Sequence, residues 1–254
     1  MKQMLKILYT HDKVNPAPAR RSWVKADVVD IFSSIQGEGM FLGARQIFIR
    51  FKNCNLACSF CDEPRDSRPK EYSPEELTAD IKLLEATKGP HHSVSLTGGE
   101  PLLYSPFLKI FLRLLKSERF KVYLETNGTL PGELQSVINL VDIIAMDFKL
   151  PSSSGQKPFW NEHLKFLKVA RQKKVFVKAV ITPDTVIGDI ERCVNLIKEV
   201  NKNISLILQP ATPVKPIDKK VDRNKLLEFL EFSTANELNN VRVIPQIHKR
   251  IGVK

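Results

Sequence analysis

The sequence predicts an α/β protein, a single domain whose parallel sheet curls into an open or partial barrel. From Val28 onward, short runs of β-branched and aromatic residues alternate with amphipathic segments, which is typical of repeated βαβ units. The chain has 254 residues, 43% of them hydrophobic, so it can bury one sizeable core. The number of such units favours a (β/α)6-type partial barrel.

The expected strands cover residues 46–51, 93–96, 121–124, 143–146, 175–180, 204–208 and 241–244. The expected helices cover 74–87, 106–117, 131–139, 159–172, 187–200 and 222–238. The first helix has the clearest start, because the run SPEE at 73–76 supplies a cap residue, a first-turn proline and acids at the positive end of the helix dipole.

Residues 1–26 are expected to form an N-terminal extension, and residues 27–254 the single folded domain. The extension has a short apolar start, two prolines and a basic stretch, without the order of a signal peptide. The longest apolar runs, such as 204–208, are too short to span a bilayer. We therefore expect a cytoplasmic protein that does not enter a membrane.

The formal charge of +11 raises the question of nucleic-acid binding. The lysines, however, are scattered along helices, and pairs such as Lys173-Lys174 and Lys219-Lys220 are typical of solvated faces. The charge is better explained by attraction of anionic small molecules, and no nucleic-acid partner is expected.

Three of the four cysteines lie close together, in the run CNLACSFC from Cys54 through Cys58 to Cys61. Such clustering in an intracellular chain indicates metal binding, because disulfides would be reduced there. Three thiolates without a nearby fourth ligand suit a metal centre with one open position, either an iron–sulfur cluster or an incomplete zinc site. Cys193 lies in a helical pattern and is expected to be a small buried hydrophobe.

Polar or glycine-rich motifs follow five of the expected strands. The cysteine loop follows 46–51, TGGEP follows 93–96, ETNG follows 121–124, DFK follows 143–146 and QPA follows 204–208. Active sites of parallel α/β sheets gather at the carboxyl ends of the strands, so these five motifs are expected to meet at one rim.

The C-x3-C-x2-C spacing, Phe60 before the last cysteine and the TGGEP run together resemble the radical S-adenosylmethionine superfamily. The resemblance implies a [4Fe–4S] cluster on Cys54, Cys58 and Cys61, whose open iron binds S-adenosylmethionine and releases a 5'-deoxyadenosyl radical after reduction. It also implies the partial barrel of that superfamily. The cofactor contacts implied by the resemblance are Phe60, Asp62, Gly98, Gly99, Glu100, Asp147, Lys149, Gln209 and Pro210. Glu100 offers an acceptor for an ammonium group, whereas Gln209 and Pro210 are equally explained as a strand end.

From Asp30 to Val253 the sequence resembles the 7-carboxy-7-deazaguanine synthase family more closely, in the QGEG turn, in the arginine before the first cysteine, and in LETNGT, DFKLPSSSG, LQPATP and the closing RVIPQIHKRIGVK. The implied reaction contracts 6-carboxy-5,6,7,8-tetrahydropterin to 7-carboxy-7-deazaguanine with loss of ammonia, a step toward queuosine. The radical would take a hydrogen from C6, and S-adenosylmethionine would be regenerated.

The same resemblance implies substrate contacts at Ile35, Gln36, Gly37, Glu38, Arg50 and Thr97. Arg50 would pair with the substrate carboxylate through its guanidinium fork. From the residues alone, QGEG could equally be a hairpin turn and Arg50 a surface charge, and His248 reads as a surface or packing residue.

Two positions depart from the family pattern. Glu63 stands where the family usually has a threonine or serine that binds magnesium, so Glu63 is the candidate ligand for an uncertain Mg²⁺. Asp147-Phe148-Lys149 replaces the usual Ser-Pro-Lys, and keeps only the lysine. A divergent enzyme acting on another substrate therefore remains an alternative.

Two further alternatives belong to other functional classes. One is a radical activating enzyme that acts on a protein partner. The other is an electron-transfer or iron-sensing module, which needs a fourth cluster ligand that only Cys193 could supply. The preferred reading implies a pterin substrate, a flavodoxin or ferredoxin as reductant, and a homodimer.

Overall fold

A computed structural model describes residues 24–63, 67–213 and 219–253, which form one nine-stranded sheet. The strand order is β3-β1-β2-β4-β5-β6-β7-β8-β9. The strands from β2 through β4 to β9 are parallel to their neighbours. Their bounds are β2 Arg45–Phe51, β4 Ser93–Gly98, β5 Val122–Thr126, β6 Ile143–Phe148, β7 Lys174–Ile181, β8 Ser205–Pro210 and β9 Val241–Val243. The predicted parallel strands are therefore confirmed within a few residues.

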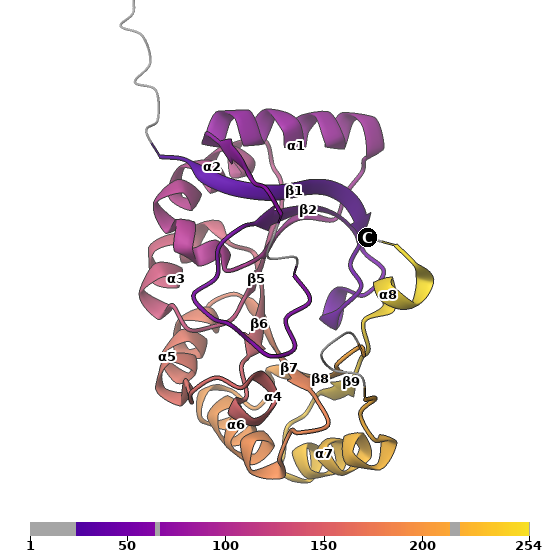
Figure 1. Cartoon of the computed structure of the whole chain (residues 1–254). Coiled ribbons are helices and arrows are strands. Elements are labelled where there is room, and N and C mark those ends of the chain that lie inside the picture. The colour runs from indigo at the N-terminus through magenta and orange to yellow at the C-terminus, as the bar shows by residue number, and fades with distance from the viewer. Residues whose placement is uncertain (1–23, 64–66, 214–218, 254) are drawn as a thin grey trace, which may run out of the picture.

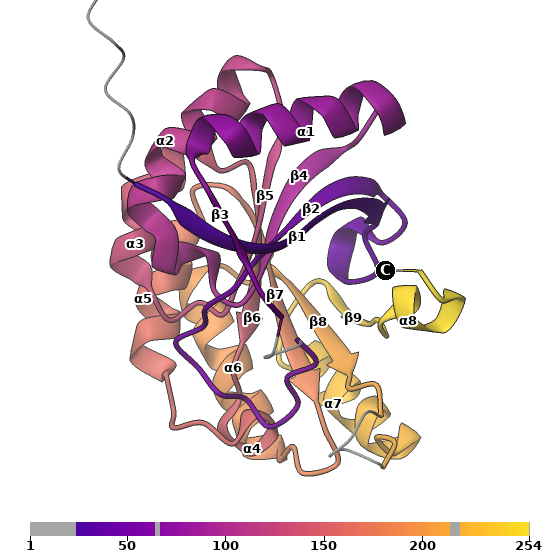
Figure 2. The same ribbon diagram turned by 45° about the horizontal axis from the view of Figure 1, so that its top comes forward.

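The sheet curves like a letter C, with the helices on its outer face and its opening near the C-terminal end of the chain (Figures 1 and 2). The outer helices are α1 Pro74–Lys88, α2 Ser105–Ser117, α3 Pro131–Val137, α5 Trp160–Ala170, α6 Ile187–Val200 and α7 Arg223–Ala235. The predicted cap of α1 is present, because Ser73 and Glu76 form a reciprocal capping box. This arrangement confirms the partial barrel.

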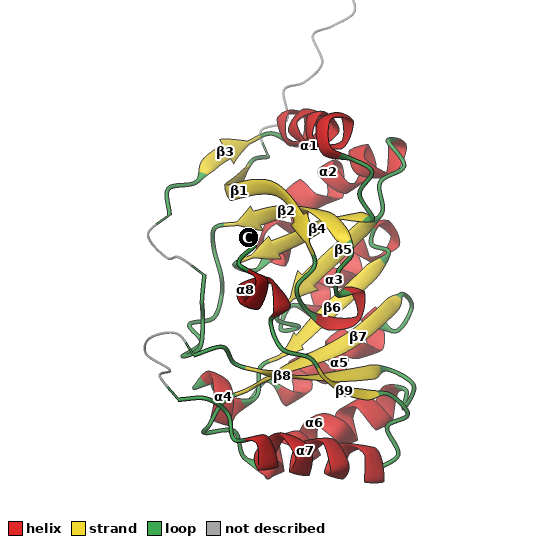
Figure 3. Cartoon of the chain, turned by 90° about the vertical axis from the view of Figure 1, so that its right-hand side faces the viewer, coloured by secondary structure: helices red, strands yellow, loops and turns green. Residues whose placement is uncertain are grey.

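Two strands at one edge of the sheet were not predicted. β1 (Ala26–Ile35) pairs antiparallel with β2, and β3 (Lys70–Tyr72) pairs antiparallel with β1. The side view of Figure 3 shows them beside β2, at the end of the sheet remote from β9. β1 begins at Ala26, and residues 1–23 of the expected extension lie outside the described residues.

Short helices and turns lie at both ends of the parallel strands. α4 (Pro151–Ser154), α8 (Ile247–Ile251) and the 3-10 turn η2 (Pro101–Tyr104) follow β6, β9 and β4, whereas the 3-10 turns η1 (Gly39–Phe41) and η3 (Ile138–Leu140) precede β2 and β6. α8 is joined to the loop after β1, because the Ile247 amide donates to the Gly37 carbonyl at 2.9 Å. The C-terminal segment thus covers the open side of the barrel.

The core has two parts because the strands alternate their side chains between two faces. The larger part lies between the sheet and the outer helices and includes Cys193, which is fully buried as predicted. The smaller part lies on the inner face, where Tyr123, Phe176 and Ile207 pack against Phe41 of η1. The Phe41 ring lies 5.7 Å from the Tyr123 ring, so η1 fills the barrel below the strand ends.

Within residues 24–63, 67–213 and 219–253, no helix is both long and apolar enough to cross a bilayer.

Candidate active site

Two adjoining hollows lie at the carboxyl ends of the parallel strands. The larger has a volume of about 420 Å³ and contains the cysteine loop, and the smaller has about 250 Å³ and lies beside β1 and α8. They share wall residues, namely Glu38, Asp62, Glu63, Thr97, Glu125 and Lys249. The five motifs that were predicted to meet at one rim therefore do so. Each motif begins either within the last residues of its strand or just after the strand ends.

Cys54, Cys58 and Cys61 all line the larger hollow. The start of their loop is held by the backbone of TGGEP, where the Glu100 amide donates to the Asn53 carbonyl at 2.7 Å. A Cβ atom on Gly99 would lie 2.0 Å from that carbonyl oxygen. Glycine is therefore needed at position 99 for the two backbone segments to approach this closely.

The middle of the cysteine loop is held by two other strand ends. The Asn127 amide donates to Asn55 at 2.8 Å and lies 3.9 Å from the Cys54 sulfur. On the opposite side, the Ser59 amide donates to the Ser154 carbonyl of α4 at 2.9 Å, and Gln156 donates to the Ala57 carbonyl at 2.8 Å. The loop thus rests on α4 and on the loop after β5.

The three thiols are soft ligands of the kind that binds an iron–sulfur cluster. Among the residues the structure describes, no three His, Cys, Asp or Glu side chains are placed to hold one ion. Cluster ligands bind separate irons and lie farther apart than the ligands of one ion. In the metal-free chain, burial raises the pKa of Cys58 to about 11 and also raises that of Cys54, so metal binding must displace protons from these thiols.

Glu100 does not lie where the sequence placed it. Its side chain is fully buried and is absent from the lining of both hollows. One carboxylate oxygen accepts from Leu102 N at 3.1 Å and Thr126 Oγ1 at 2.8 Å, and the other accepts from Asn127 N at 2.8 Å. Glu100 therefore joins the ends of β4 and β5, and burial raises its pKa to about 7.

The other predicted cofactor residues line the larger hollow, with the exception of Pro210. They are Phe60, Asp62, Gly98, Gly99, Asp147, Lys149 and Gln209. Lys149 lies 2.9 Å from Asp147, and its ammonium lies 5.1 Å from the centre of the Phe60 ring. Asp147 Oδ1 and Gln209 Oε1 are buried without a hydrogen-bond partner among the described residues. Two unused acceptors in a cavity lined by thiols fit a bound ligand that donates hydrogen bonds, as the hydroxyls and amines of S-adenosylmethionine do.

The predicted substrate residues line the smaller hollow. Four of them line only the smaller hollow, namely Ile35, Gln36, Gly37 and Arg50, and the other two, Glu38 and Thr97, line both hollows. The Gln36 side chain is buried and donates to Glu125 at 2.9 Å, and Thr97 donates to the other Glu125 oxygen at 3.3 Å. Burial raises the pKa of Glu125, which the sequence reasoning did not assign to the site.

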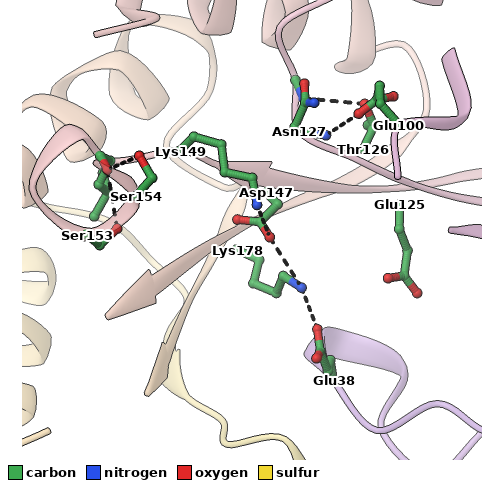
Figure 4. A network of polar contacts seen from close by, with 12 residues as sticks. Glu38, Glu100, Glu125, Thr126, Asn127, Asp147, Lys149, Ser153, Ser154 and Lys178 are labelled. Atoms are coloured by element: carbon green, nitrogen blue, oxygen red, sulfur yellow. Dashed lines mark hydrogen bonds and ion pairs between the residues drawn. The ribbon is translucent and has the colours of Figure 1, made fainter. Parts of the chain in front are cut away.

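Figure 4 shows a row of alternating charges. The row begins in the wall of the larger hollow and ends at Glu38, which lines both hollows. Lys149 pairs with Asp147, Lys178 lies 3.5 Å from Asp147, and Lys178 also forms an ion pair with Glu38. Burial alone would raise the pKa of Glu38, but Lys178 and Gln246 reverse the effect and hold it at about 2. The sequence reasoning missed Lys178, although a lysine within the apolar strand run VFVKAVI was a signal for it.

Glu63, the candidate magnesium ligand, forms an ion pair with Arg50 in this structure, with Nη1 and Oε2 separated by 3.1 Å. Burial raises the pKa of Glu63 to about 7, while Arg50 acts in the opposite direction. His248 also lines the smaller hollow and packs directly against Gly37, which agrees with the packing role that the sequence left open for it.

Comparison with known proteins agrees with this geometry. Residues 48–200 match the model of the Radical SAM superfamily. The 7-carboxy-7-deazaguanine synthase of Geobacter sulfurreducens is 40% identical over 253 residues, covering 89% of this chain and 97% of that protein. The enzyme of the same name from Methanothermobacter thermautotrophicus is 33% identical and covers 91% and 99%. The chain belongs to the 7-carboxy-7-deazaguanine synthase family of the radical SAM superfamily.

Solved structures show the same fold. The crystal structure of QueE from Escherichia coli is 20% identical, covers 87% of this chain and 94% of that one, and gives a TM-score of 0.59. The structure of SuiB from Streptococcus suis bound to S-adenosylmethionine has the same identity and TM-score but covers 76% of this chain and 48% of its own. The superfamily's cofactors are a [4Fe–4S] cluster and S-adenosylmethionine. Membership argues against an electron-transfer module, and Cys193 lies in the core and lines neither hollow.

Proposed function

We propose that this chain converts 6-carboxy-5,6,7,8-tetrahydropterin to 7-carboxy-7-deazaguanine with loss of ammonia. The observation that carries the proposal is the division of the site into a cysteine-lined hollow and an adjoining smaller hollow with Arg50 in its wall. A cofactor in the first and a small anionic substrate in the second would be neighbours across a shared wall, which is the proximity that hydrogen abstraction needs.

Cys54, Cys58 and Cys61 would hold the cluster, and the wall with Asp147, Lys149 and Gln209 would hold S-adenosylmethionine. When bound, these cofactors supply a radical that abstracts hydrogen, and the protein supplies position. Asp147 Oδ1 and Gln209 Oε1 are the acceptors left unused inside the hollow, so they are the groups that would orient the cofactor by accepting its N–H or O–H donors.

In the smaller hollow, Arg50 would bind the carboxylate of the pterin, and its buried, unpaired Nε is available for that contact. Glu125 and Gln36 present buried polar groups that suit the N–H and C=O edges of a pterin ring. Gly37 leaves room for the contact between the QGEG turn and His248, so the turn fixes one wall of the hollow.

The remaining features of the proposal concern the setting of the reaction. We place it in the cytoplasm, where thiols stay reduced, with a flavodoxin or ferredoxin as electron donor and a homodimer as the assembly. Cys54 and Cys61 are exposed in the loop, so a cluster there would be accessible to a protein reductant.

The test is anaerobic turnover of the reconstituted protein with dithionite, S-adenosylmethionine, magnesium and 6-carboxytetrahydropterin, analysed by mass spectrometry. Formation of 7-carboxy-7-deazaguanine without stoichiometric loss of S-adenosylmethionine is the expected result. If 5'-deoxyadenosine accumulates without that product, the radical chemistry stands and the substrate assignment is wrong. A parallel reaction with EDTA in place of magnesium measures the metal dependence.

A further inference from the structure

We propose that Glu63 determines how tightly the anionic group of the substrate binds, because its carboxylate competes for the guanidinium of Arg50. The inference rests on the proposed function and adds a specificity residue to it. It concerns a position at which this chain has a longer and charged side chain than the threonine or serine usual in the family.

The contact is specific and partly sheltered from water. Arg50 Nη1 lies 3.1 Å from Glu63 Oε2, and the two side chains are 23% and 29% exposed. The Phe32 ring lies beneath the guanidinium, with its centre 5.6 Å from Arg50 Cζ. Since one face of the guanidinium is covered, ligands approach the N–H groups at its edge. Glu63 already occupies one of these donors, Nη1.

The charges around the smaller hollow strengthen the competition. The lysine and arginine side chains in its described lining are Arg50 and Lys249, and Lys249 is paired with Asp62. Its described acidic lining residues are Glu38, Asp62, Glu63 and Glu125. Glu38 and Asp62 are each paired with a lysine, Lys178 and Lys249, so Glu63 and Glu125 are the acids left beside Arg50. An incoming carboxylate therefore meets uncompensated negative charge unless Glu63 moves away from Arg50, and Glu63 lies in the wall that both hollows share.

This arrangement penalises the binding of every anionic group, so an anion stays bound only when its other contacts, such as those of a ring, compensate for the penalty. A small anion that binds through its charge alone must overcome Glu63 without other contacts, and a neutral pterin does not displace Glu63 at all. Competition of this kind lowers the affinity for every anion. Anions that have no other contacts no longer bind, which is selection by an unfavourable element in the site.

The test measures binding and does not require turnover. The reconstituted protein, without S-adenosylmethionine or magnesium, is titrated anaerobically with 6-carboxypterin or with pterin, and ligand fluorescence reports the Kd. Glu63→Gln keeps the size of the side chain and removes its charge. We expect it to bind 6-carboxypterin roughly tenfold more tightly, a change of about 1.4 kcal/mol, with no change for pterin. Glu71→Gln, which breaks the exposed ion pair with Lys25 outside both hollows, is the matched control and is expected to change neither Kd.

Arg50→Gln added to Glu63→Gln is expected to abolish the gain, because the competition requires the guanidinium. Equal or weaker binding of 6-carboxypterin by Glu63→Gln overturns the inference. The titration is repeated with magnesium, and weaker binding by Glu63→Gln that appears only in this second series identifies Glu63 as a metal ligand instead. If neither wild type nor Glu63→Gln distinguishes 6-carboxypterin from pterin, the proposed substrate is wrong and the inference falls with it.

Discussion

At the scale of single residues, Lys178 is the side chain on which the polar interior of the barrel depends. It lies between Glu38 and Asp147, and its side chain is 12% exposed. Burial opposes its charge, yet the two carboxylates raise its pKa far above the usual range. Removing one partner of a buried ion pair leaves the others charged and unpaired, which is the costly case.

We therefore predict that Lys178→Met lowers the free energy of unfolding by about 3 kcal/mol. Lys168→Met is the matched control, because Lys168 pairs with Glu199 at 2.8 Å on the surface, where both side chains are about half exposed. Exposed pairs contribute about 0–1 kcal/mol. Urea denaturation of both variants measures the difference, and equal losses would show that the interior pair does not behave as buried.

Gly99 supports a second prediction at this scale. Gly99→Ala would place a methyl group 2.0 Å from the Asn53 carbonyl oxygen, so the backbone that leads into Cys54 must move. We expect this variant to fold but to retain at most a small fraction of the iron that wild type takes up, measured by iron content and visible absorbance after reconstitution. Gly132→Ala on α3 has nothing within 4 Å of the added atom and is expected to take up iron normally. Normal loading of both variants would mean that the close approach at Gly99 is dispensable.

At the scale of elements, α4 is a single turn whose role is to support the cysteine loop. Its far end is fixed by α6, because Asp189 accepts from the Ser152 amide at 2.8 Å. Its near end contacts the loop through the Ser153 and Ser154 carbonyls, which accept from Ser59. A short helix held in this way transmits the position of α6 to the cluster site.

Gln156, just after α4, offers a test of that support. Gln156→Ala removes the donor to the Ala57 carbonyl, so we expect faster amide hydrogen exchange in residues 55–61 of the metal-free protein, with unchanged exchange in β5. Ser136→Ala, which removes a side-chain donor to the backbone carbonyl of Glu133 on α3, is the control and should leave the loop unaffected. Unchanged exchange in Gln156→Ala would assign the loop's stability to its other contacts.

The elements that the sequence predicted well are those with strong hydrophobic periodicity. The motifs at the ends of the strands predicted where the candidate site lies. β1 was missed because its residues are mostly half-buried on both faces, so its pattern lacks clear alternation. α8 is one turn long and carries no helical period. The orientation of single side chains could not be predicted from the sequence either. Glu100 is an example, because a carboxylate at a strand end can point into the cavity or toward the backbone of the neighbouring strand ends.

At the scale of the whole molecule, His163 of α5 links an outer helix to the inner rim. Its Nε2 donates to the Asn127 carbonyl at 3.2 Å, and its ring packs on Phe148 at a centroid distance of 4.1 Å. Burial lowers its pKa to about 4 from the usual 6.5. The folded protein therefore keeps this ring neutral at pH values where the unfolded chain already binds the proton.

The sign of the pH effect follows from that difference. Above pH 6.5 neither state binds the proton, between pH 6.5 and 4 only the unfolded chain does, and below pH 4 both do. Stability is therefore lost as pH falls through this window, by about 3 kcal/mol from this group alone. His163→Gln can still donate to Asn127 but does not titrate, so its free energy of unfolding should fall less between pH 7 and pH 4, measured by urea denaturation. Parallel curves for the two proteins would exclude His163 as the titrating group.

The overall architecture was predictable because parallel strands with terminal motifs allow few arrangements. Most predicted cofactor residues line the larger hollow, and the predicted substrate residues line the smaller one, with Glu38, Asp62 and Thr97 in the shared wall. What joins those hollows was not predictable. The Glu38–Lys178–Asp147 row depends on residues from the loop after β1, from β7 and from β6, and no local pattern relates them. Such long-range pairs are decided by how the sheet curves.

The most direct test of the central claim, that a pterin in the smaller hollow gives up a hydrogen to the cofactor in the larger one, is isotope transfer. The reconstituted protein is incubated anaerobically with S-adenosylmethionine, a reductant and 6-carboxytetrahydropterin carrying deuterium at C6, and the S-adenosylmethionine is recovered for mass spectrometry. The account predicts that deuterium appears in the recovered S-adenosylmethionine while 7-carboxy-7-deazaguanine accumulates. Deuterium that stays in the pterin or passes only to solvent would contradict it.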